Sequence, residues 1–168
     1  MYFLGVESAE SETRAIVVDL ESARVVASAS ETHTLVEGVP IGSQEQDPAM
    51  WIAALDRTVK ECLNSLGAER DKVVAMSVGA QSQGLVLLDE NNQVVRPAKI
   101  KGDTSGAKQL QQLNRAFGGA PGLSELIGNR LKVDSLVTKL LYIKEREPNH
   151  FRKTTSVMQS REFINYWL

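Results

Sequence analysis

A short polar segment between two apolar runs carries the residues best suited to chemistry. It reads Gln81-Ser82-Gln83, with Gly79 before it and Gly84 after it. Amide and hydroxyl side chains both donate and accept hydrogen bonds, so this tip suits the hydroxyl groups of a small polyol or sugar. The same residues also fit a plain polar turn between two strands, and chemistry alone leaves both interpretations open.

The elements that would position this tip follow from hydrophobic periodicity and turn residues. Three strands joined by short turns predict an antiparallel meander, and a long amphipathic helix follows them. The expected strands are 2–6, 14–20, 23–34, 72–78, 85–88, 93–96 and 155–158, and the expected helices are 48–66, 103–117, 121–127, 134–146 and one that starts at 160. This order predicts an α/β domain with a mixed sheet, antiparallel in its first three strands and flanked by helices.

Helix ends are marked by acidic residues and proline. Asp47 followed by Pro48 predicts an N-cap and a first helical position, while Asp103 and Asp134 are expected to cap later helices. Cys62 lies on the apolar stripe of the long helix, which predicts an inert core thiol. The charged residues of 139–146 are interpreted as a solvated helix face.

Composition excludes several classes of partner. The formal charge of −2 in 168 residues gives no reason to expect nucleic acid, and no apolar run is long enough for a membrane span. One cysteine and no signal-peptide pattern fit a cytoplasmic protein, and two isolated histidines argue against a zinc site.

Several motifs together give the chain a recognisable pattern. They are Glu45-Gln46-Asp47-Pro48 with Trp51, Gly84-Leu85-Val86-Leu87-Leu88-Asp89, Arg96-Pro97-Ala98, Gly128-Asn129-Arg130, Lys139-Leu140-Leu141, and Glu147-Pro148 with Phe151. In order and spacing they resemble the N-terminal domain of the FGGY carbohydrate kinases, and within that family the xylulokinases most. The resemblance implies an actin-like, ribonuclease-H-like fold over residues 1–168, which would form the sugar-side domain.

The resemblance also implies a function. Members of this family transfer a phosphoryl group from Mg-ATP to a sugar hydroxyl. A second, C-terminal domain holds most of the nucleotide site and supplies the base, so no catalytic residue is expected in these 168 residues. The pattern of the last helix stops at Trp167-Leu168, as in a chain that is cut. A second kinase domain or a copy of this chain is therefore an expected partner, beside a small sugar or polyol.

The first hairpin departs from the family pattern D-x-G-T-x-S-x-R. Glu7 stands for the aspartate and is the candidate metal ligand, Ala9 replaces glycine, and Glu10 stands for threonine, while Ser11 and Arg14 complete the phosphate-facing set. A carboxylate about 4 Å from a phosphate charge costs about 4 kcal/mol before screening, or roughly three powers of ten in affinity. The hairpin is predicted to be a poor phosphate site; an altered working site, with Glu10 turned away or helping to hold a cation, stays open.

The sugar-facing motifs have changed as well. The family's Q-M-H-G reads Gln81-Ser82-Gln83-Gly84, and its W-x-D-x-R segment keeps only Asp103, with Lys101 and Ser105 for the aromatic and the arginine. The resemblance assigns residues 81–84 and Asp103 to substrate binding. Two functions follow: a sugar kinase domain, impaired or inactive as an isolated chain, or a non-catalytic sugar-binding or scaffold domain. A truncated gene product is a third possibility.

Overall fold

The chain folds into two compact units, and the computed structural model describes every residue from 1 to 168. The first unit consists of Met1–Thr34, Asp47–Ser82 and Ser160–Leu168. The second consists of Leu35–Gln46 and Gln83–Gln159. The tip expected to bind sugar therefore contains the point, between Ser82 and Gln83, at which the chain passes from one unit to the other.

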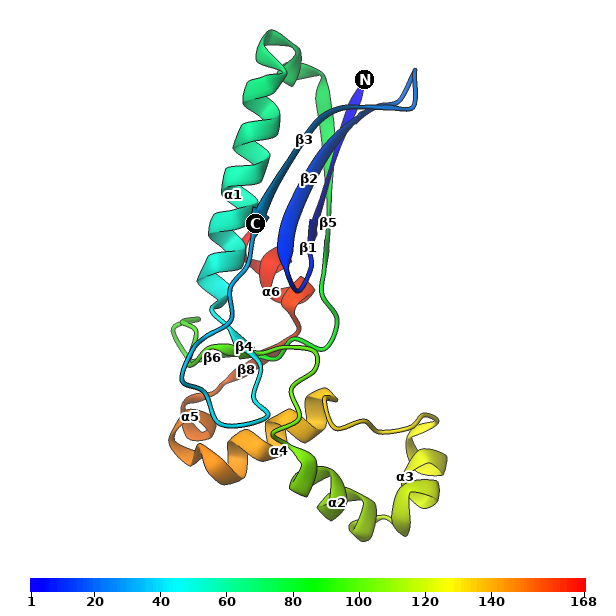
Figure 1. Cartoon of the computed structure of the whole chain (residues 1–168), viewed down its shortest axis with the longest axis vertical. Coiled ribbons are helices and arrows are strands. Elements are labelled where there is room, and N and C mark those ends of the chain that lie inside the picture. Colours follow the sequence, from blue (N-terminus) through cyan, green and yellow to red (C-terminus); the bar gives the residue numbers. More distant parts are fainter. The chain divides into compact units, whose positions relative to one another are not determined.

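A four-stranded mixed sheet forms the centre of the first unit (Figure 1). The unit contains β1 (Tyr2–Ser8), β2 (Glu12–Asp19), β3 (Arg24–Thr32), α1 (Pro48–Ser65), the 3-10 helix η1 (Gly67–Lys72), β5 (Val73–Ala80) and α6 (Ser160–Trp167). The strand order is β3-β2-β1-β5, with β1, β2 and β3 antiparallel and β5 parallel to β1. The predicted meander and mixed sheet are confirmed.

The core of this unit lies between the sheet and α1, which runs along β2 and β3 (Figure 1). Leu4 and Val6 are buried toward the helix, whereas the alternate residues Phe3 and Glu7 belong to the opposite, exposed face of β1. Trp51 of α1 is fully buried and meets Phe163 of α6 edge to face, with ring centroids 6.5 Å apart. Aromatic pairs favour this geometry, so Trp51 acts as a packing residue of this core.

The start of α1 follows the predicted capping pattern. Asp47 accepts a 2.9 Å hydrogen bond from the Ala49 N–H, and Pro48 occupies the first turn. The chain leaves the helix through Gly67, whose φ of +56° suits a residue without a Cβ. Cys62 is buried, and burial raises the pKa of its thiol, as expected for an unreactive core cysteine.

The second unit combines short strand pairs with helices. Its elements are β4 (Glu45–Gln46), β6 (Val86–Leu88), β7 (Ala98–Lys99), α2 (Ala107–Ala116), α3 (Gly119–Ile127), α4 (Leu136–Arg146), α5 (Pro148–Lys153) and β8 (Ser156–Met158). Strand β4 pairs with β7, and β6 pairs with β8, both antiparallel. Leu85, Leu87 and Ile143 form a buried apolar cluster between β6 and α4.

Two predictions of local structure are wrong in this unit. The expected strand 93–96 makes only one bridge, between Val94 and Leu88, beside a hydrogen bond from the Val95 N–H to the Leu87 carbonyl at 2.9 Å. Asp103 and Asp134 cap no helix: α2 begins after Gly106 and α4 after Ser135, and neither helix has a side-chain cap. Both carboxylates are occupied instead by backbone N–H groups distant in sequence, Gln44 for Asp103 and Gly102 for Asp134.

None of the helices offers the long apolar stretch that crossing a bilayer demands.

Candidate functional site

The turn between β1 and β2 places the candidate phosphate-facing residues at the surface of the first unit. The turn is closed by the Ala9 N–H, which donates to the Glu12 carbonyl at 2.9 Å. Glu7 faces Arg14 across the antiparallel pair, and both side chains are exposed, as are Glu10 and Ser11. The Arg14 guanidinium forms an ion pair with Glu12. The one cation of the hairpin is therefore partly neutralised by a residue outside the predicted set.

His33, which directly follows β3, holds this turn in place through hydrogen bonds. Its Nδ1 lies 3.1 Å from the Ala9 carbonyl oxygen, which can only accept, so Nδ1 carries the proton. Nε2 then accepts from the Thr13 hydroxyl at 2.9 Å, and Thr13 Oγ1 also shares a 3.2 Å hydrogen bond with Ser8 Oγ. Partial burial holds the pKa of His33 below its usual value, so the ring is neutral at pH 7. Sequence reasoning missed this residue, because nothing local links it to a turn more than twenty residues away.

A shallow concavity of about 410 Å³ lies on the exposed face of the sheet beside this hairpin. Its lining includes Glu7 and Arg14, and Gly5, Ser77 and Gly79 leave it open because their side chains are small or absent. Glu7 supplies the only carboxylate in the lining, and nowhere in the chain do three His, Cys, Asp or Glu side chains gather as a metal site would require. Mg²⁺ commonly takes one or two protein carboxylates together with substrate phosphates and waters. Glu7 fits one ligand of such a metal–phosphate group and no more.

The sheet register brings the start of the polar tip beside this hairpin. Strands β1 and β5 are parallel, and Ser8 at the end of β1 is paired with Ala80 at the end of β5. The Gln81 N–H continues the ladder by donating to the Ser8 carbonyl at 2.8 Å. Within the first unit, the phosphate-facing turn and the first residue of the tip therefore leave the sheet at the same edge. In α/β sheets, ligands bind at the carboxyl ends of the parallel strands.

The second half of the tip is held by a buried lysine. Gln83 has a φ of +63°, a conformation that is unusual for a residue other than glycine. Its carbonyl accepts a 2.6 Å hydrogen bond from Lys139 Nζ of α4. Lys139 is fully buried, so the prediction that residues 139–146 form a solvated face is wrong for the first of them. Gly84 is also buried, whereas Ser82 is exposed.

Burial controls the charge of this lysine. Desolvation lowers the pKa of Lys139 to about 8, because it penalises the ammonium form. The carboxylates of Asp103 and Asp134 oppose this shift, and the positive charge of Lys99 adds to it. The charge state of Lys139 is therefore sensitive to mildly alkaline conditions.

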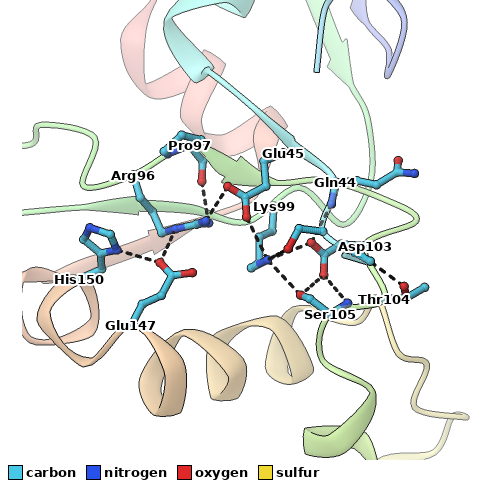
Figure 2. Close-up of polar contacts among 12 residues, drawn as sticks. Gln44, Glu45, Arg96, Pro97, Lys99, Asp103, Thr104, Ser105, Glu147 and His150 are labelled. Atoms are coloured by element: carbon cyan, nitrogen blue, oxygen red, sulfur yellow. Dashed lines mark hydrogen bonds and ion pairs between the residues drawn. The ribbon is translucent and has the colours of Figure 1, made fainter. Parts of the chain in front are cut away.

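A second buried lysine organises the surroundings of Asp103 (Figure 2). Lys99 Nζ donates to Glu45 Oε1 at 3.1 Å, to Asp103 Oδ2 at 3.0 Å and to Ser105 Oγ at 3.0 Å. The same ammonium lies 4.5 Å from the centre of the Tyr142 ring, a distance at which cation–π attraction contributes. Lys99 is fully buried, and the polar groups around it balance its charge.

The carboxylate of Asp103 has little capacity left for a ligand. Oδ2 accepts from Lys99 and from the Gln44 N–H at 3.0 Å, and Oδ1 accepts from the N–H and hydroxyl of Ser105 (Figure 2). A carboxylate offers about four acceptor positions, and the residue is completely buried. A sugar hydroxyl would have to displace one of these donors to reach it.

The ion network continues through Arg96. Its guanidinium contacts Glu45 at 2.6 Å and Glu147 at 2.8 Å, and Glu147 also meets His150 at 2.7 Å (Figure 2). Glu45, Arg96 and Glu147 come from three separate motifs of the sequence, and the fold joins them as one cluster in which Glu45 and Arg96 are buried and Glu147 is partly exposed. We name the cluster of Glu45, Arg96, Lys99, Asp103 and Glu147 the buried ion network.

Comparisons with known proteins identify the family of this chain. The chain belongs to the FGGY family of carbohydrate kinases, because the model of that family's N-terminal domain matches residues 2–168. A xylulose kinase of Streptomyces rubiginosus is 34% identical over 161 residues, which make up 96% of this chain and 32% of that protein. The chain therefore spans about a third of the length of the curated relatives it matches.

Solved structures support the same fold. A xylulose kinase from Rhodospirillum rubrum superposes with a TM-score of 0.83 at 27% identity, covering 100% of this chain and 34% of that one. A xyloylose kinase from Brucella ovis superposes with a TM-score of 0.89 at 24% identity, covering 100% of this chain and 34% of that one, which is a likeness of fold. The predicted actin-like, ribonuclease-H-like fold is confirmed.

Proposed function

We propose that this chain is the sugar-side domain of an ATP-dependent carbohydrate kinase, and that it binds a ketopentose or related polyol at residues 81–84. The observation that carries the proposal is the hydrogen bond from the Gln81 N–H to the Ser8 carbonyl. It sets the start of the polar tip beside the phosphate-facing turn, and a phosphoryl transfer needs the acceptor and the donor phosphate side by side.

The first hairpin would face the metal–phosphate end of the nucleotide. Glu7 lines the concavity and would take the place of the metal-holding carboxylate, while Arg14 and Ser11 would face the phosphates. ATP and its metal would supply the phosphoryl group and neutralise its charge. Glu10, exposed at the turn, opposes a phosphate by like-charge repulsion, so nucleotide binding is expected to be weak.

The tip would bind hydroxyl groups by hydrogen bonding. Gln81 and Gln83 carry amides and Ser82 an exposed hydroxyl, so the three together offer both donors and acceptors. Gly84 would let the backbone approach the ligand. Asp103 contributes to this site chiefly by holding its surroundings, because all its acceptor positions are filled by the chain.

The base that removes the proton from the sugar hydroxyl would come from another polypeptide segment or chain. The matched relatives are about three times as long as this chain, so a second kinase domain is the partner that we propose, with a copy of this chain as the other candidate. We place the domain in the cytoplasm, as the single buried cysteine suggests.

A non-catalytic sugar-binding or scaffold role is the second candidate, and a specific observation favours it. The Ala9 N–H already donates a hydrogen bond within the turn, to the Glu12 carbonyl. Glu10 adds a negative charge, and Arg14 forms an ion pair with Glu12. Each of these features lowers the capacity of the hairpin to hold phosphates, whereas the tip keeps its hydrogen-bonding groups.

Calorimetric titration of the 168-residue chain tests the proposal. D-xylulose and xylitol are titrated separately from Mg-ATP, with Gln83→Ala as the site variant and Gln112→Ala, at an exposed position of α2, as its match. We expect saturable heat from at least one of the two sugars, lost in Gln83→Ala and kept in Gln112→Ala, and binding of Mg-ATP that is much weaker. Saturable Mg-ATP heat without any sugar heat contradicts the proposal.

A further inference from the structure

Lys139 is the buried charged residue closest to the sugar tip that the proposed function leaves without a role. It is the fourth residue of α4 and has no exposed surface, and its ammonium donates a hydrogen bond to the Gln83 carbonyl at 2.6 Å. No carboxylate meets its ammonium at ion-pair distance, in contrast to Lys99, which contacts both Glu45 and Asp103. Its hydrogen-bonding capacity is directed at the backbone of the tip.

The residue that it holds is conformationally unfavourable. A φ of +63° places Gln83 in the left-handed region, where a side chain crowds the backbone. Such a conformation persists only where the surroundings fix it, and such positions cluster at ligand sites. The charge-assisted hydrogen bond from Lys139 supplies that constraint at the carbonyl of the same residue.

An inert packing role fits Lys139 poorly. An apolar side chain of similar length, such as methionine, would fill the same volume without the desolvation penalty of a buried ammonium. The charged groups that face Lys139 are Asp103 in the segment after β7, Asp134 ahead of α4, and Lys99 on β7. The two carboxylates favour the ammonium and Lys99 disfavours it, so the surroundings offset only part of the penalty.

We propose that Lys139 is a positioning residue of the sugar site: its ammonium fixes the carbonyl and backbone of Gln83, and thereby the direction in which the Gln83 side chain meets a ketose or polyol. The substrate part of this inference rests on the proposed function. The conformational part concerns the chain without any ligand and can be measured alone.

The test compares Lys139→Met with Lys144→Met, which removes an exposed lysine from the same helix. Backbone chemical shifts report the φ of Gln83, and the ¹³Cε shift of Lys139 reports its protonation between pH 6.5 and 10. In the unaltered chain we expect the Gln83 signals to follow the Lys139 titration, with a shared midpoint near the lowered pKa of about 8. This measurement needs no variant, so it decides even if Lys139→Met does not fold.

The variants extend the test to sugar binding. We expect Lys139→Met to move the Gln83 signals toward those of ordinary extended or helical backbone and to weaken D-xylulose binding at least tenfold, while Lys144→Met changes neither. Adding Gln83→Asn to Lys139→Met should restore the left-handed signals, since asparagine tolerates that region better than glutamine. A structural role alone would lower the unfolding midpoint and leave the pH profile of Gln83 flat.

Three results would overturn the inference. The first is that the Gln83 signals do not change as Lys139 titrates. The second is that the Gln83 signals are the same in Lys139→Met and in the unaltered chain. The third is that D-xylulose affinity is unchanged although the backbone of Gln83 has moved. If the unaltered chain binds no D-xylulose or xylitol, the proposed function fails, and the Gln83 signals alone decide on Lys139.

Discussion

The two candidate regions of this protein treat their charges in opposite ways. In the hairpin of the first unit, Glu7, Glu10 and Arg14 are exposed. In the second unit, Lys139 and the buried ion network, apart from the partly exposed Glu147, lie out of solvent with their partners fixed. Substitution of an exposed charged residue changes folding stability little, whereas a buried charge that has lost its partner destabilises the fold strongly.

This contrast bears on the motifs through which the chain resembles the kinase family. Glu45, Arg96, Asp103 and Glu147 match the family pattern, and each of them is tied into the buried ion network. Ala9 and Glu10 depart from the pattern, and Glu10 lies in the exposed turn. Retention of the first set therefore reports on the fold of the second unit, and function must be judged from the hairpin and the tip.

The largest expected effect comes from breaking the buried ion network. Lys99→Met leaves Glu45 and Asp103 without their shared cation, and loss of one partner of a buried ion pair costs about 3–5 kcal/mol. Unfolding in urea should show this loss, whereas Lys144→Met, at an exposed position, should stay within about 0.5 kcal/mol of the unaltered chain. A loss below about 1 kcal/mol for Lys99→Met would mean that the network does not stabilise the second unit.

The next effect is a pH dependence that belongs to Lys139. Its pKa is about 8 in the folded chain and about 10.4 in the unfolded chain, so between these values the unfolded state binds more protons. The free energy of unfolding should therefore rise with pH across this window, by about 3 kcal/mol at most. The difference between the unaltered chain and Lys139→Met isolates this contribution from other titrating groups. A difference that is flat from pH 7 to 10.5 would contradict the buried charge.

A smaller effect is expected at the exposed hairpin, on binding rather than on folding. Glu10→Thr restores the residue type of the family pattern and removes a negative charge from the turn. Because the site is exposed and screened, we expect Mg-ATP to bind about tenfold more tightly, with the unfolding midpoint unchanged. Glu90→Thr, in an exposed turn of the second unit, is the matched control. Unchanged nucleotide affinity in Glu10→Thr would show that Glu10 faces away from the phosphates.

The smallest effect separates a true helix cap, Asp47, from Asp134, which only resembles a cap in the sequence. Asp47→Ala should destabilise the chain by about 1 kcal/mol, since it removes the acceptor of the Ala49 N–H. Asp134→Ala should cost clearly less, because Asp134 caps no helix and its backbone contact, to Gly102, is long at 3.3 Å. Equal losses in chemical denaturation would contradict this assignment.

The sequence was sufficient for features that depend on near neighbours. The Asp47-Pro48 start and the antiparallel order of the first three strands need only local patterns, and the structure confirms them. The family could be recognised from the sequence because several of its motifs occur in order along the chain, and the family model matches residues 2–168.

The remaining features depend on contacts between distant segments. Lys139 looks like one of several charged residues on α4, and only the fold brings it to a carbonyl 56 residues away. His33 likewise reaches the turn at Ala9 from the far end of β3. Asp103 fits a helix cap by local rules, but the Gln44 N–H and the buried Lys99 occupy its carboxylate first.

The central proposal is that this domain binds a sugar while its first hairpin binds the nucleotide only weakly. It can be tested residue by residue. The most direct measurement follows the backbone amide signals of the ¹⁵N-labelled chain during titration with D-xylulose and, separately, with Mg-ATP. The account predicts saturable shifts at residues 81–84 with the sugar, and only weak, unsaturated shifts at residues 7–14 with the nucleotide. Tight, saturable shifts confined to residues 7–14, with residues 81–84 silent toward the sugar, would contradict it.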